Sequence, residues 1–244
     1  MFFILLFANK ELPPFLTNNS LTRNSYFSML KVSVFQCNAF QENCYLVWDE
    51  ASREAFVIDP GFASEWEWQR VAQQLQSSSL TLRAVLLTHN HADHCLGSAF
   101  PARLCQSEVC GSVEDQNHMP SVGAQAFAFG LDVSPQWSPI THDLHEGDTL
   151  QLGGSRVEVI DCPGHSHHGL CYYFPADKLL FSGDVLFYGS VGRSDFGPSM
   201  GGNGPLLRQS IIDKLLTLPA DVIVYPGHGP QTTIGTESTY NPYL

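Results

Sequence analysis

Four short apolar runs in this sequence are each followed by a residue whose side chain is suited to binding a metal ion. Apolar runs of this length, bounded by turn residues, are typical of buried β-strands. The residues that follow the four runs are His89, His165, Asp184 and His228. Loops at strand ends on a rigid scaffold are where functional sites usually form. The sequence therefore predicts a strand-rich fold in which four strand ends meet at one rim.

The densest group of such residues comes directly after the run from Ala84 to Leu87. Six consecutive positions read His89-Asn90-His91-Ala92-Asp93-His94. Imidazoles and a carboxylate are ligands that zinc and similar metals prefer, and packing uncharged histidines together without a cation costs free energy. A metal site is therefore the leading hypothesis, and a solvated histidine-rich loop is the alternative.

Composition excludes several classes of partner. The chain has 244 residues, 43% of them hydrophobic, which is enough to bury a substantial core. The formal net charge is −12, with only twelve Lys and Arg, and this argues against nucleic acids, whose phosphates are bound through cationic side chains. The seven cysteines are odd in number and lack C-x-x-C spacing, which predicts free thiols in a reducing, cytoplasmic location.

The first 28 residues differ from the rest of the chain. An apolar stretch runs from Met1 to Ala8, but no positive charge precedes it and no small-residue cleavage pattern follows it. It is also far too short to span a bilayer. We expect residues 1–28 to be an extension outside the core, residues 29–244 to form one domain, and the protein not to associate with membranes.

Short β-type runs dominate the sequence after Met29. The predicted strands are Val32–Cys37, Cys44–Trp48, Ala55–Asp59, Ala84–Thr88, Thr149–Leu152, Val157–Asp161, Leu170–Phe174, Leu179–Ser182 and Val222–Tyr225. Ser64 and Glu67 predict a capping box at the start of a helix that ends near Gln76, and apolar spacing predicts another helix over 206–216. Residues 111–147 have weak periodicity, so we expect one helix and a long lid-like loop there.

Five blocks of sequence form an ordered pattern between about Leu30 and Leu244. They are Thr88 to His94, Pro163-Gly164-His165, Ser182 to Phe187, Gly189 to Phe196, and Tyr225 to Pro230 with the following Thr232 to Gly235 and Asn241-Pro242. Together they resemble the metallo-β-lactamase superfamily, and within it the short glyoxalase II-like (hydroxyacylglutathione hydrolase-like) proteins. The resemblance implies an α+β fold, an αββα sandwich of two mixed β-sheets between helical layers, with a dinuclear metal site at the sheet edge.

The resemblance also implies a complete set of ligands for two divalent metal ions. His89, His91 and His165 would hold the first ion, Asp93, His94 and His228 the second, and Asp184 would bridge them. Asp93 and Asp184 would also act in catalysis. Three-histidine sites suit zinc, whereas the second site, with its carboxylate, would also accept iron or manganese.

One ligand position admits more than one candidate. The family usually has Thr or Ser, Pro and Gly after the third histidine, whereas here Ser166 is followed by His167-His168. His165 is favoured because it alone follows Pro-Gly. The histidines expected at the surface or in loops are His118, His142, His145, His167 and His168.

Substrate binding is less well defined by the sequence. Arg193 is a candidate for holding a substrate carboxylate, with a structural ion pair to Asp195 as the equal alternative. Full-length glyoxalase II enzymes carry a C-terminal helical domain that helps to bind glutathione, and only sixteen residues follow His228 here. The identity of the thiol carrier therefore stays open.

The implied chemistry is hydrolysis. Two metal ions about 3.5 to 4 Å apart lower the pKa of a bridging water toward about 7, and the hydroxide attacks a carbonyl that the metals polarise. A thioester suits such a site because a thiolate, with a thiol pKa of about 8.5, departs without a strong general acid. We expect a metallohydrolase of a small-molecule thioester such as S-lactoylglutathione or a related acylthiol.

The alternative function is that of an oxidoreductase. Persulfide dioxygenases share the block from Gly192 to Phe196, but they bind one iron ion through a His-His-Asp set. The complete second set, Asp93, His94 and His228, favours hydrolysis. The oligomeric state stays open.

Overall fold

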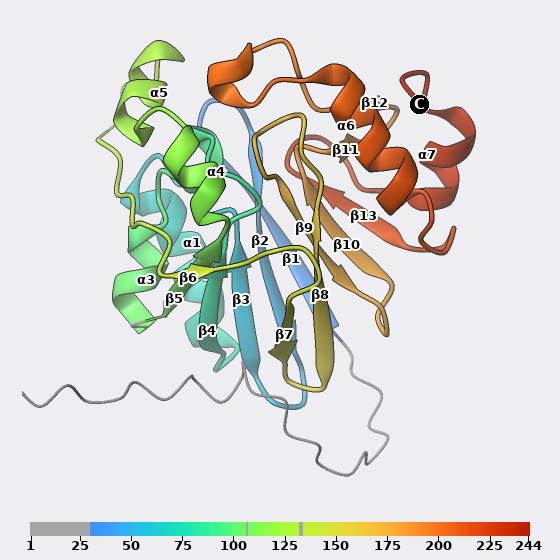
Figure 1. Ribbon diagram of the computed structural model, residues 1–244. Helices are drawn as coiled ribbons and strands as arrows, with labels where there is room; N and C mark the ends of the chain where they lie inside the picture. Colours follow the sequence, from blue (N-terminus) through green and yellow to red (C-terminus); the bar gives the residue numbers. More distant parts are fainter. Residues whose placement is uncertain (1–29, 106, 132–133) are drawn as a thin grey trace, which may run out of the picture.

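Two mixed β-sheets pack face to face, and helices cover their outer faces (Figure 1). The computed structural model describes residues 30–105, 107–131 and 134–244, so the predicted extension, residues 1–28, lies outside the described residues. Each large sheet has six strands. The predicted α+β fold, an αββα sandwich, is confirmed.

The first sheet has the strand order β1-β2-β3-β4-β5-β6. Its strands are β1 (Leu30–Cys37), β2 (Glu42–Asp49), β3 (Glu54–Ile58), β4 (Thr81–Leu86), β5 (Glu108–Gly111) and β6 (His142–Asp143). β1 to β3 pair antiparallel, whereas β3 to β6 pair parallel. Parallel neighbours require crossover connections, and these connections contain the helices α1 to α5.

The second sheet has the order β14-β13-β10-β9-β8-β7. Its strands are β7 (Thr149–Leu152), β8 (Ser155–Asp161), β9 (Leu170–Phe174), β10 (Leu179–Gly183), β13 (Ile223–Pro226) and β14 (Thr232–Thr233). β10 and β13 are parallel, and the other neighbours are antiparallel. A separate small hairpin consists of β11 (Leu186–Phe187) and β12 (Ser190–Val191).

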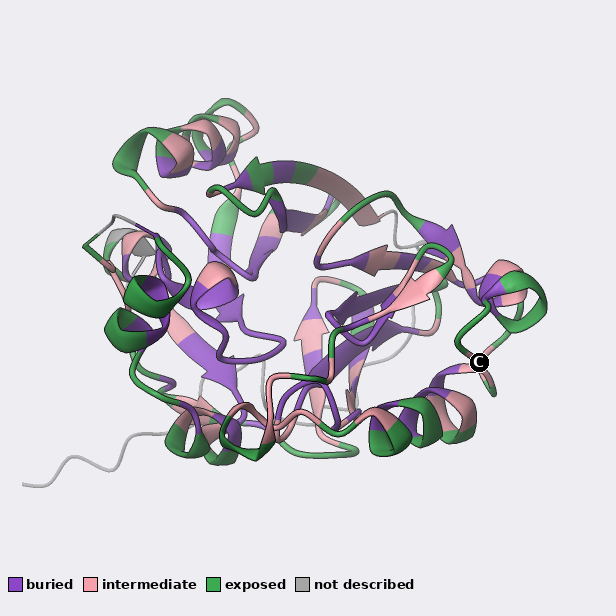
Figure 2. Ribbon diagram, turned by 90° about the horizontal axis from the view of Figure 1, so that it is seen from above, coloured by how far each residue is buried: buried purple, intermediate pink, exposed green. Residues whose placement is uncertain are grey.

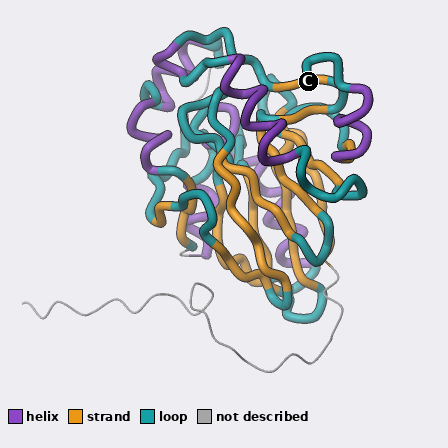
Figure 3. The backbone as a smooth tube through the Cα atoms, turned by 45° about the vertical axis from the view of Figure 1, so that its right-hand side comes forward, coloured by secondary structure: helices purple, strands orange, loops and turns teal. Residues whose placement is uncertain are grey.

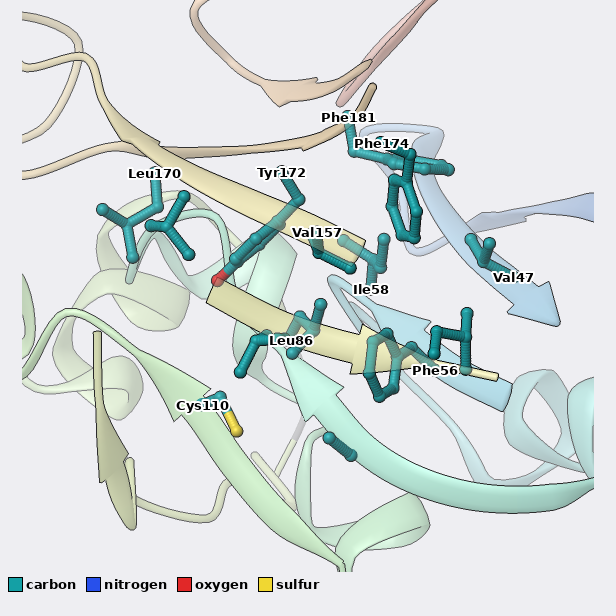
Figure 4. Packing of buried hydrophobic residues seen from close by; sticks show 14 of the residues in the cluster. Val47, Phe56, Ile58, Leu86, Cys110, Val157, Leu170, Tyr172, Phe174 and Phe181 are labelled. Atoms are coloured by element: carbon teal, nitrogen blue, oxygen red, sulfur yellow. The ribbon is translucent and has the colours of Figure 1, made fainter. Parts of the chain in front are cut away.

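Side chains at alternate positions of the strands fill the space between the sheets (Figure 4). Phe56 and Ile58 of β3 point into this core from the first sheet, and Tyr172 and Phe174 of β9 point into it from the second. The Tyr172 hydroxyl donates a 2.6 Å hydrogen bond to the backbone carbonyl of Leu87, just past the end of β4. This bond connects the two sheets close to the edge that carries the site.

Short helices surround the sheets, with exposed outer faces and buried inner faces (Figure 2). The helices are α1 (Glu65–Ser77), α2 (Ala92–Cys95), α3 (Ala99–Cys105), α4 (Val113–His118), α5 (Val122–Ala128), α6 (Gly204–Ser210) and α7 (Ile234–Tyr240), with a 3₁₀ turn at Pro198–Met200 and a π-helical turn at Ile211–Leu215. Within the described ranges, no helix combines the length and the apolar character needed to cross a membrane.

The first predicted helix forms as α1, but only half of its predicted capping box does. The Ser64 hydroxyl accepts a hydrogen bond from the backbone N–H of Glu67 at 3.3 Å. The Glu67 carboxylate accepts from the backbone N–H groups of Ala63, at 2.6 Å, and Asn38, at 3.0 Å, instead of returning to Ser64. Glu67 therefore fastens α1 to the turn between β1 and β2.

The region 111–147 was predicted wrongly as one helix and a long loop. It contains two helices, α4 and α5, and the short strand β6. The helices have only six and seven residues, too few to show a clear period in the sequence. Each begins at a serine, Ser112 or Ser121, whose hydroxyl accepts a backbone hydrogen bond. These two N-cap serines were the sequence signal that could have indicated two helices.

Strand ends meet at one edge of the sandwich, where loops connect the strands to the helices (Figure 3). Gly183 at the end of β10 lies opposite Pro226 at the end of β13, and the Gly227 N–H donates a 2.8 Å hydrogen bond to the Gly183 carbonyl. β4 ends at Leu86, before the predicted Thr88, because the N–H of Thr88 donates to a side chain, that of Asp59, at 2.7 Å.

Candidate metal centre

The seven predicted ligand residues converge on one cluster at this edge. Their nitrogen and oxygen atoms form overlapping groups in which all atoms lie within 4.8 Å of one another. The groups are His89, His91 and His165; His89, His94 and Asp184; and Asp93, His94 and His228. Because the groups share members, they make one continuous cluster.

The first group is a triangle of ring nitrogens. His91 Nδ1 lies 2.9 Å from His89 Nε2 and 2.9 Å from His165 Nε2, and the two Nε2 atoms are 3.2 Å apart. Nitrogens bound at about 2.05 Å to one tetrahedral zinc ion would be about 3.3 Å apart. The triangle therefore has nearly the size that one such ion requires.

Hydrogen bonds determine which ring nitrogen carries the proton in two of these histidines. The Thr88 hydroxyl donates to Asp59 at 2.7 Å, so it accepts from His89 Nδ1 at 3.0 Å. His165 Nδ1 donates to the backbone carbonyl of Arg193 at 2.6 Å. A neutral imidazole has one N–H, so the Nε2 lone pairs of His89 and His165 face each other across the triangle.

His165 is the histidine of its loop that reaches the centre, as the sequence favoured. His168 instead forms an ion pair with Asp161, with 3.1 Å between Nδ1 and Oδ2, and the His167 ring packs against His118 with 5.1 Å between centroids. None of the described histidines that were expected outside the site belongs to the cluster.

The second group combines two imidazoles with a carboxylate. Asp93 Oδ2 lies 3.3 Å from His228 Nε2 and 3.8 Å from His94 Nε2. The Nδ1 atoms have other partners: Asp59 Oδ2 accepts from His94 at 3.0 Å, and the Phe40 carbonyl accepts from His228 at 3.2 Å. When neutral, both imidazoles therefore direct an Nε2 lone pair toward the centre.

Asp184 lies between the two groups. Its Oδ1 is 3.2 Å from His94 Nε2, and its Oδ2 is 3.5 Å from His165 Nε2 and 3.6 Å from His228 Nε2. Gly227 leaves this space free, since a Cβ at that position would overlap Asp184 Oδ1 and the His94 ring. The position of Asp184 allows it to bridge two ions.

The protonation of the two groups differs. Burial lowers the pKa of His91 to about 3, and it also lowers the pKa of the other two histidines of the triangle. Burial acts in the same direction on His94, but the carboxylates of Asp184 and Asp93 outweigh it and raise the pKa of His94 well above its usual value. Although burial would raise the pKa of Asp184, His94 holds that pKa well below its usual range.

The donor atoms of the cluster fit divalent metal ions. In the part of the chain that the structure describes, His94 Nε2 and Asp184 Oδ1 are buried and lie 3.2 Å apart as an ion pair, but neither has a partner in hydrogen-bond geometry. Such atoms, and lone pairs that face each other, cost free energy that a cation among them would remove. Imidazole nitrogens suit zinc, copper, iron and nickel, and carboxylate oxygens extend the choice to manganese.

Asp59 supports both groups and was missed as a site residue. Its carboxylate accepts hydrogen bonds from Thr88, which orients His89, and from His94 directly. A metal-ligating histidine usually donates its second ring N–H to such an acceptor. A signal was present in the sequence, because Asp59 ends an apolar run and precedes Pro60-Gly61.

Asp115 and Gln125 hold the loop that carries the first four ligands. Asp115 accepts from the backbone N–H of Asn90 at 2.8 Å and from that of His168 at 3.0 Å, so it joins two ligand loops. Gln125 accepts from the N–H of Ala92 and donates to the carbonyl of Asn90, both at 3.0 Å. Both residues lie in the weakly periodic region, where no local signal pointed to them.

Glu42 is a further buried carboxyl group beside the cluster, within 4.8 Å of Asp59 and His94. Burial raises the pKa of Glu42 well above its usual value. Burial therefore favours the uncharged form of this carboxyl group beside the centre.

A cavity of about 260 Å³ opens above the cluster. Its lining consists of His91, Asp93, His165, Asp184 and His228 from the cluster, with Phe40, Phe129, Phe187, Arg193 and Phe196 around them. Arg193 forms an ion pair with Asp195, with hydrogen bonds of 2.9 and 3.1 Å, as one of the two alternatives for this residue predicted. Its role toward a substrate stays a prediction.

The fold and the cluster together define a class of αββα proteins with a metal centre at the sheet edge. Residues 37–228 match the family model of the metallo-beta-lactamase superfamily, and the chain belongs to this superfamily. Members of the superfamily bind metal ions, and the chain is accordingly a metal-dependent enzyme of this family.

Named relatives carry different activities. The chain is 38% identical over 217 residues to the hydroxyacylglutathione hydrolase GloC of Haemophilus influenzae, covering 88% of this chain and 98% of that protein. The crystal structure of the B3 metallo-beta-lactamase BLEG-1 superposes with a TM-score of 0.77 at 32% identity, covering 88% of this chain and 99% of that one. TTHA1623 in a di-iron-bound form gives a TM-score of 0.74 at 35% identity, covering 87% and 100%.

Proposed function

We propose that this protein is a dinuclear metallohydrolase that cleaves thioesters of small acyl groups, similar to hydroxyacylglutathione hydrolases. The observation that carries the proposal is the position of Asp184, whose carboxylate lies within 3.2 to 3.6 Å of ligand nitrogens from both groups. A centre for a single ion would use this carboxylate with one group of nitrogens, whereas here Asp184 lies within reach of both groups. The name of the Haemophilus influenzae relative supports the choice of thioesters.

The two groups would each hold one ion. The triangle of His89, His91 and His165 would hold the first, and Asp93, His94 and His228 would hold the second, with Asp184 shared. A bound pair of metal ions would supply the acidity that turns water into a nucleophile at neutral pH and the Lewis acidity that polarises a carbonyl. Zinc, iron and manganese are all compatible with these donors.

The protein side chains orient the reactants. Asp93 lines the cavity, and the charges of His94 and His228 hold its pKa below the usual value although burial would raise it. The Asp93 carboxylate is therefore anionic at neutral pH and can accept a hydrogen bond from the attacking water. Asp59 and the Phe40 carbonyl keep His94 and His228 in the required orientation.

The cavity favours a thioester over an amide or β-lactam. Among the described residues that line it, the proton-bearing side chains outside the ligand set are limited to Arg193, which is paired with Asp195. A departing amide nitrogen needs a proton, whereas a thiolate does not. The lining therefore lacks an acid that only the amide reaction requires.

The direct test combines metal analysis with a thioester panel. Protein purified without chelators is expected to contain two metal ions per chain and to release thiol from acyl thioesters, followed with a thiol-reactive dye. Removing the metals with a chelator should abolish the release, and adding back zinc, iron or manganese one at a time should restore it. Two bound metals without turnover of any thioester would contradict the proposal, and so would one iron per chain with oxygen consumption on glutathione persulfide.

We also propose a cytoplasmic location. Six cysteines in the described residues are buried free thiols, which suits a reducing compartment. Fractionation of cells that express the tagged protein would test it, and recovery from an oxidising compartment would contradict it.

A further inference from the structure

Four phenylalanines from separate elements and loops form a wall around the metal centre. They are Phe40 in the β1–β2 turn, Phe129 after α5, Phe187 in β11 and Phe196 after β12, and all four line the cavity. We call them the phenylalanine wall. Because Phe40, Phe129 and the pair Phe187 and Phe196 come from three distant stretches of the sequence, only the fold brings all four together.

The rings of the wall contact the ligands and one another. Phe196 packs edge to face on His91, with 5.4 Å between centroids, and Phe187 packs on His228 at 6.2 Å. Phe129 bridges Phe196 at 6.3 Å and Phe40 at 6.2 Å, again in edge-to-face geometry. The wall therefore begins at the metal ligands and continues to the cavity mouth, where Phe40 and Phe129 are 42% and 38% exposed.

Charge in the cavity does not favour an anionic substrate group. Among the described lining residues, Arg193 is the one permanent cation, and it is held by the Asp195 carboxylate and by stacking at 4.5 Å over the Phe196 ring. The chain as a whole carries a formal charge of −12. A carboxylate on the substrate would therefore lack a cation other than the metals.

We propose that the phenylalanine wall is an acyl-binding pocket that selects thioesters with uncharged apolar acyl groups, branched or aromatic, over hydroxyacyl groups. The inference rests on the proposed thioester hydrolysis. Phe187 and Phe196 are the rings in contact with the ligands, so a carbonyl bound at the centre would have these two rings as apolar neighbours for its acyl carbons. The cavity of about 260 Å³ is small for a whole substrate but large enough for a branched or phenyl group.

The preference follows from desolvation. A hydroxyl beside the carbonyl would face aromatic rings and would lose its hydrogen bonds to water without replacement. Apolar pockets discriminate against an added hydroxyl by up to about 100-fold. Aromatic acyl groups would gain edge-to-face contacts with the wall.

Isosteric substrates test the selectivity directly. Isobutyryl and lactoyl thioesters of the same thiol differ only by a methyl or a hydroxyl group. After division by the rate of hydroxide-catalysed hydrolysis, kcat/KM is expected to be about tenfold or more higher for isobutyryl than for lactoyl, with phenylacetyl also favoured. Equal or higher values for lactoyl would overturn the inference while leaving thioester hydrolysis intact. No hydrolysis of any thioester by the two-metal protein would instead refute the proposed function.

Variants test whether the phenylalanine wall causes the selectivity between acyl groups. Phe129→Ala and Phe196→Ala are expected to lower kcat/KM for the phenylacetyl thioester about 10- to 100-fold and to lower that for the acetyl thioester much less. Phe127→Ala is the matched control, because Phe127 belongs to α5, is 87% exposed and does not line the cavity. Equal losses for both substrates in the wall variants, with metal content unchanged, would overturn the inference.

A binding experiment is independent of turnover. Phenylacetamide is an uncharged analogue of the acyl group, and calorimetry on the metal-free protein is expected to show that it binds more tightly than lactamide. Phe196→Ala should remove this difference, and Phe127→Ala should keep it. Equal binding of both amides by the unsubstituted protein would contradict an apolar acyl pocket.

Discussion

The two halves of the metal centre differ in charge and in exposure. In the triangle, His89, His91 and His165 are only 2%, 4% and 4% exposed, and burial keeps them neutral. In the other half, the side chains of His228 and Asp93 are 25% and 16% exposed. Neighbouring carboxylates raise the pKa of its two histidines, His94 and His228. One half is a buried set of uncharged nitrogens, and the other is an ionic network in which His94 is buried but Asp93 and His228 are partly exposed.

This difference assigns a distinct task to each half. Neutral nitrogens bind an ion without first losing protons, so the triangle is expected to hold the tighter ion. The ionic half has to release a proton from its histidines before it binds, and it is more open to water. It is therefore expected to exchange its ion more readily and to accept a wider choice of metals.

Loss of the shared carboxylate should have the largest effect. Asp184→Asn removes the negative charge that both halves contact, and thioester turnover is expected to fall about 1000-fold or more. Steady-state kinetics and metal analysis of the same samples would measure it. Asp221→Asn is the control, since Asp221 pairs with the exposed Lys178 and lies outside the cluster. Nearly normal turnover in Asp184→Asn would contradict the proposed bridging role of Asp184.

The halves can be emptied one at a time. His228→Ala is expected to leave one tightly bound ion per chain, whereas His91→Ala should lose the tighter ion, and each should lower turnover about 100-fold or more. Metal titration by calorimetry would distinguish the two variants. Identical affinities for the remaining ion in the two variants would contradict the expectation that the triangle holds the tighter ion.

Residues that orient the ligands should matter less for metal binding than the ligands themselves. Asp59→Asn places an amide N–H where His94 now donates, so the ionic half is expected to bind its ion about 10- to 100-fold more weakly. Thr88→Val removes the acceptor of His89 Nδ1 and one of the hydrogen bonds that Asp59 accepts, and it should weaken the triangle by a smaller factor. Competition with a coloured chelator would give both affinities. A larger loss from Thr88→Val would reverse the proposed role of Asp59.

The smallest expected effect is a difference between the halves in the pH at which each loses its metal ion. Protons compete with metal ions, and a ligand whose metal-free pKa is raised takes up its proton at a higher pH. As the pH falls below 7, the half with His94 and His228 should therefore lose its ion first, while the triangle, where the pKa of His91 is about 3, should retain its ion to lower pH. Metal content after dialysis at a series of pH values would show two steps in this order. Simultaneous loss, or the reverse order, would contradict the comparison.

Much of the fold followed from local patterns. Thr149–Leu152 and Leu170–Phe174 match the observed strands at both ends, because turns with glycine or proline limit them. The strand Glu108–Gly111 was missed, and one helix was predicted where two short helices follow it, because their few residues are set by packing against neighbours and not by periodicity. The same region contains Asp115 and Gln125, so its misprediction also hid two supports of the site.

The sequence by itself indicated the ligand chemistry, because the group from His89 to His94 and the residues after three other apolar runs are of the types that bind metal ions. The resemblance to the metallo-β-lactamase superfamily then implied the full ligand set. Only the tertiary structure decided which nitrogen of each imidazole faces the centre and which rings enclose it. His94 and its acceptor Asp59 are 35 residues apart, and the phenylalanine wall combines residues from position 40 to position 196. Such contacts depend on how distant segments pack, and no local pattern encodes them.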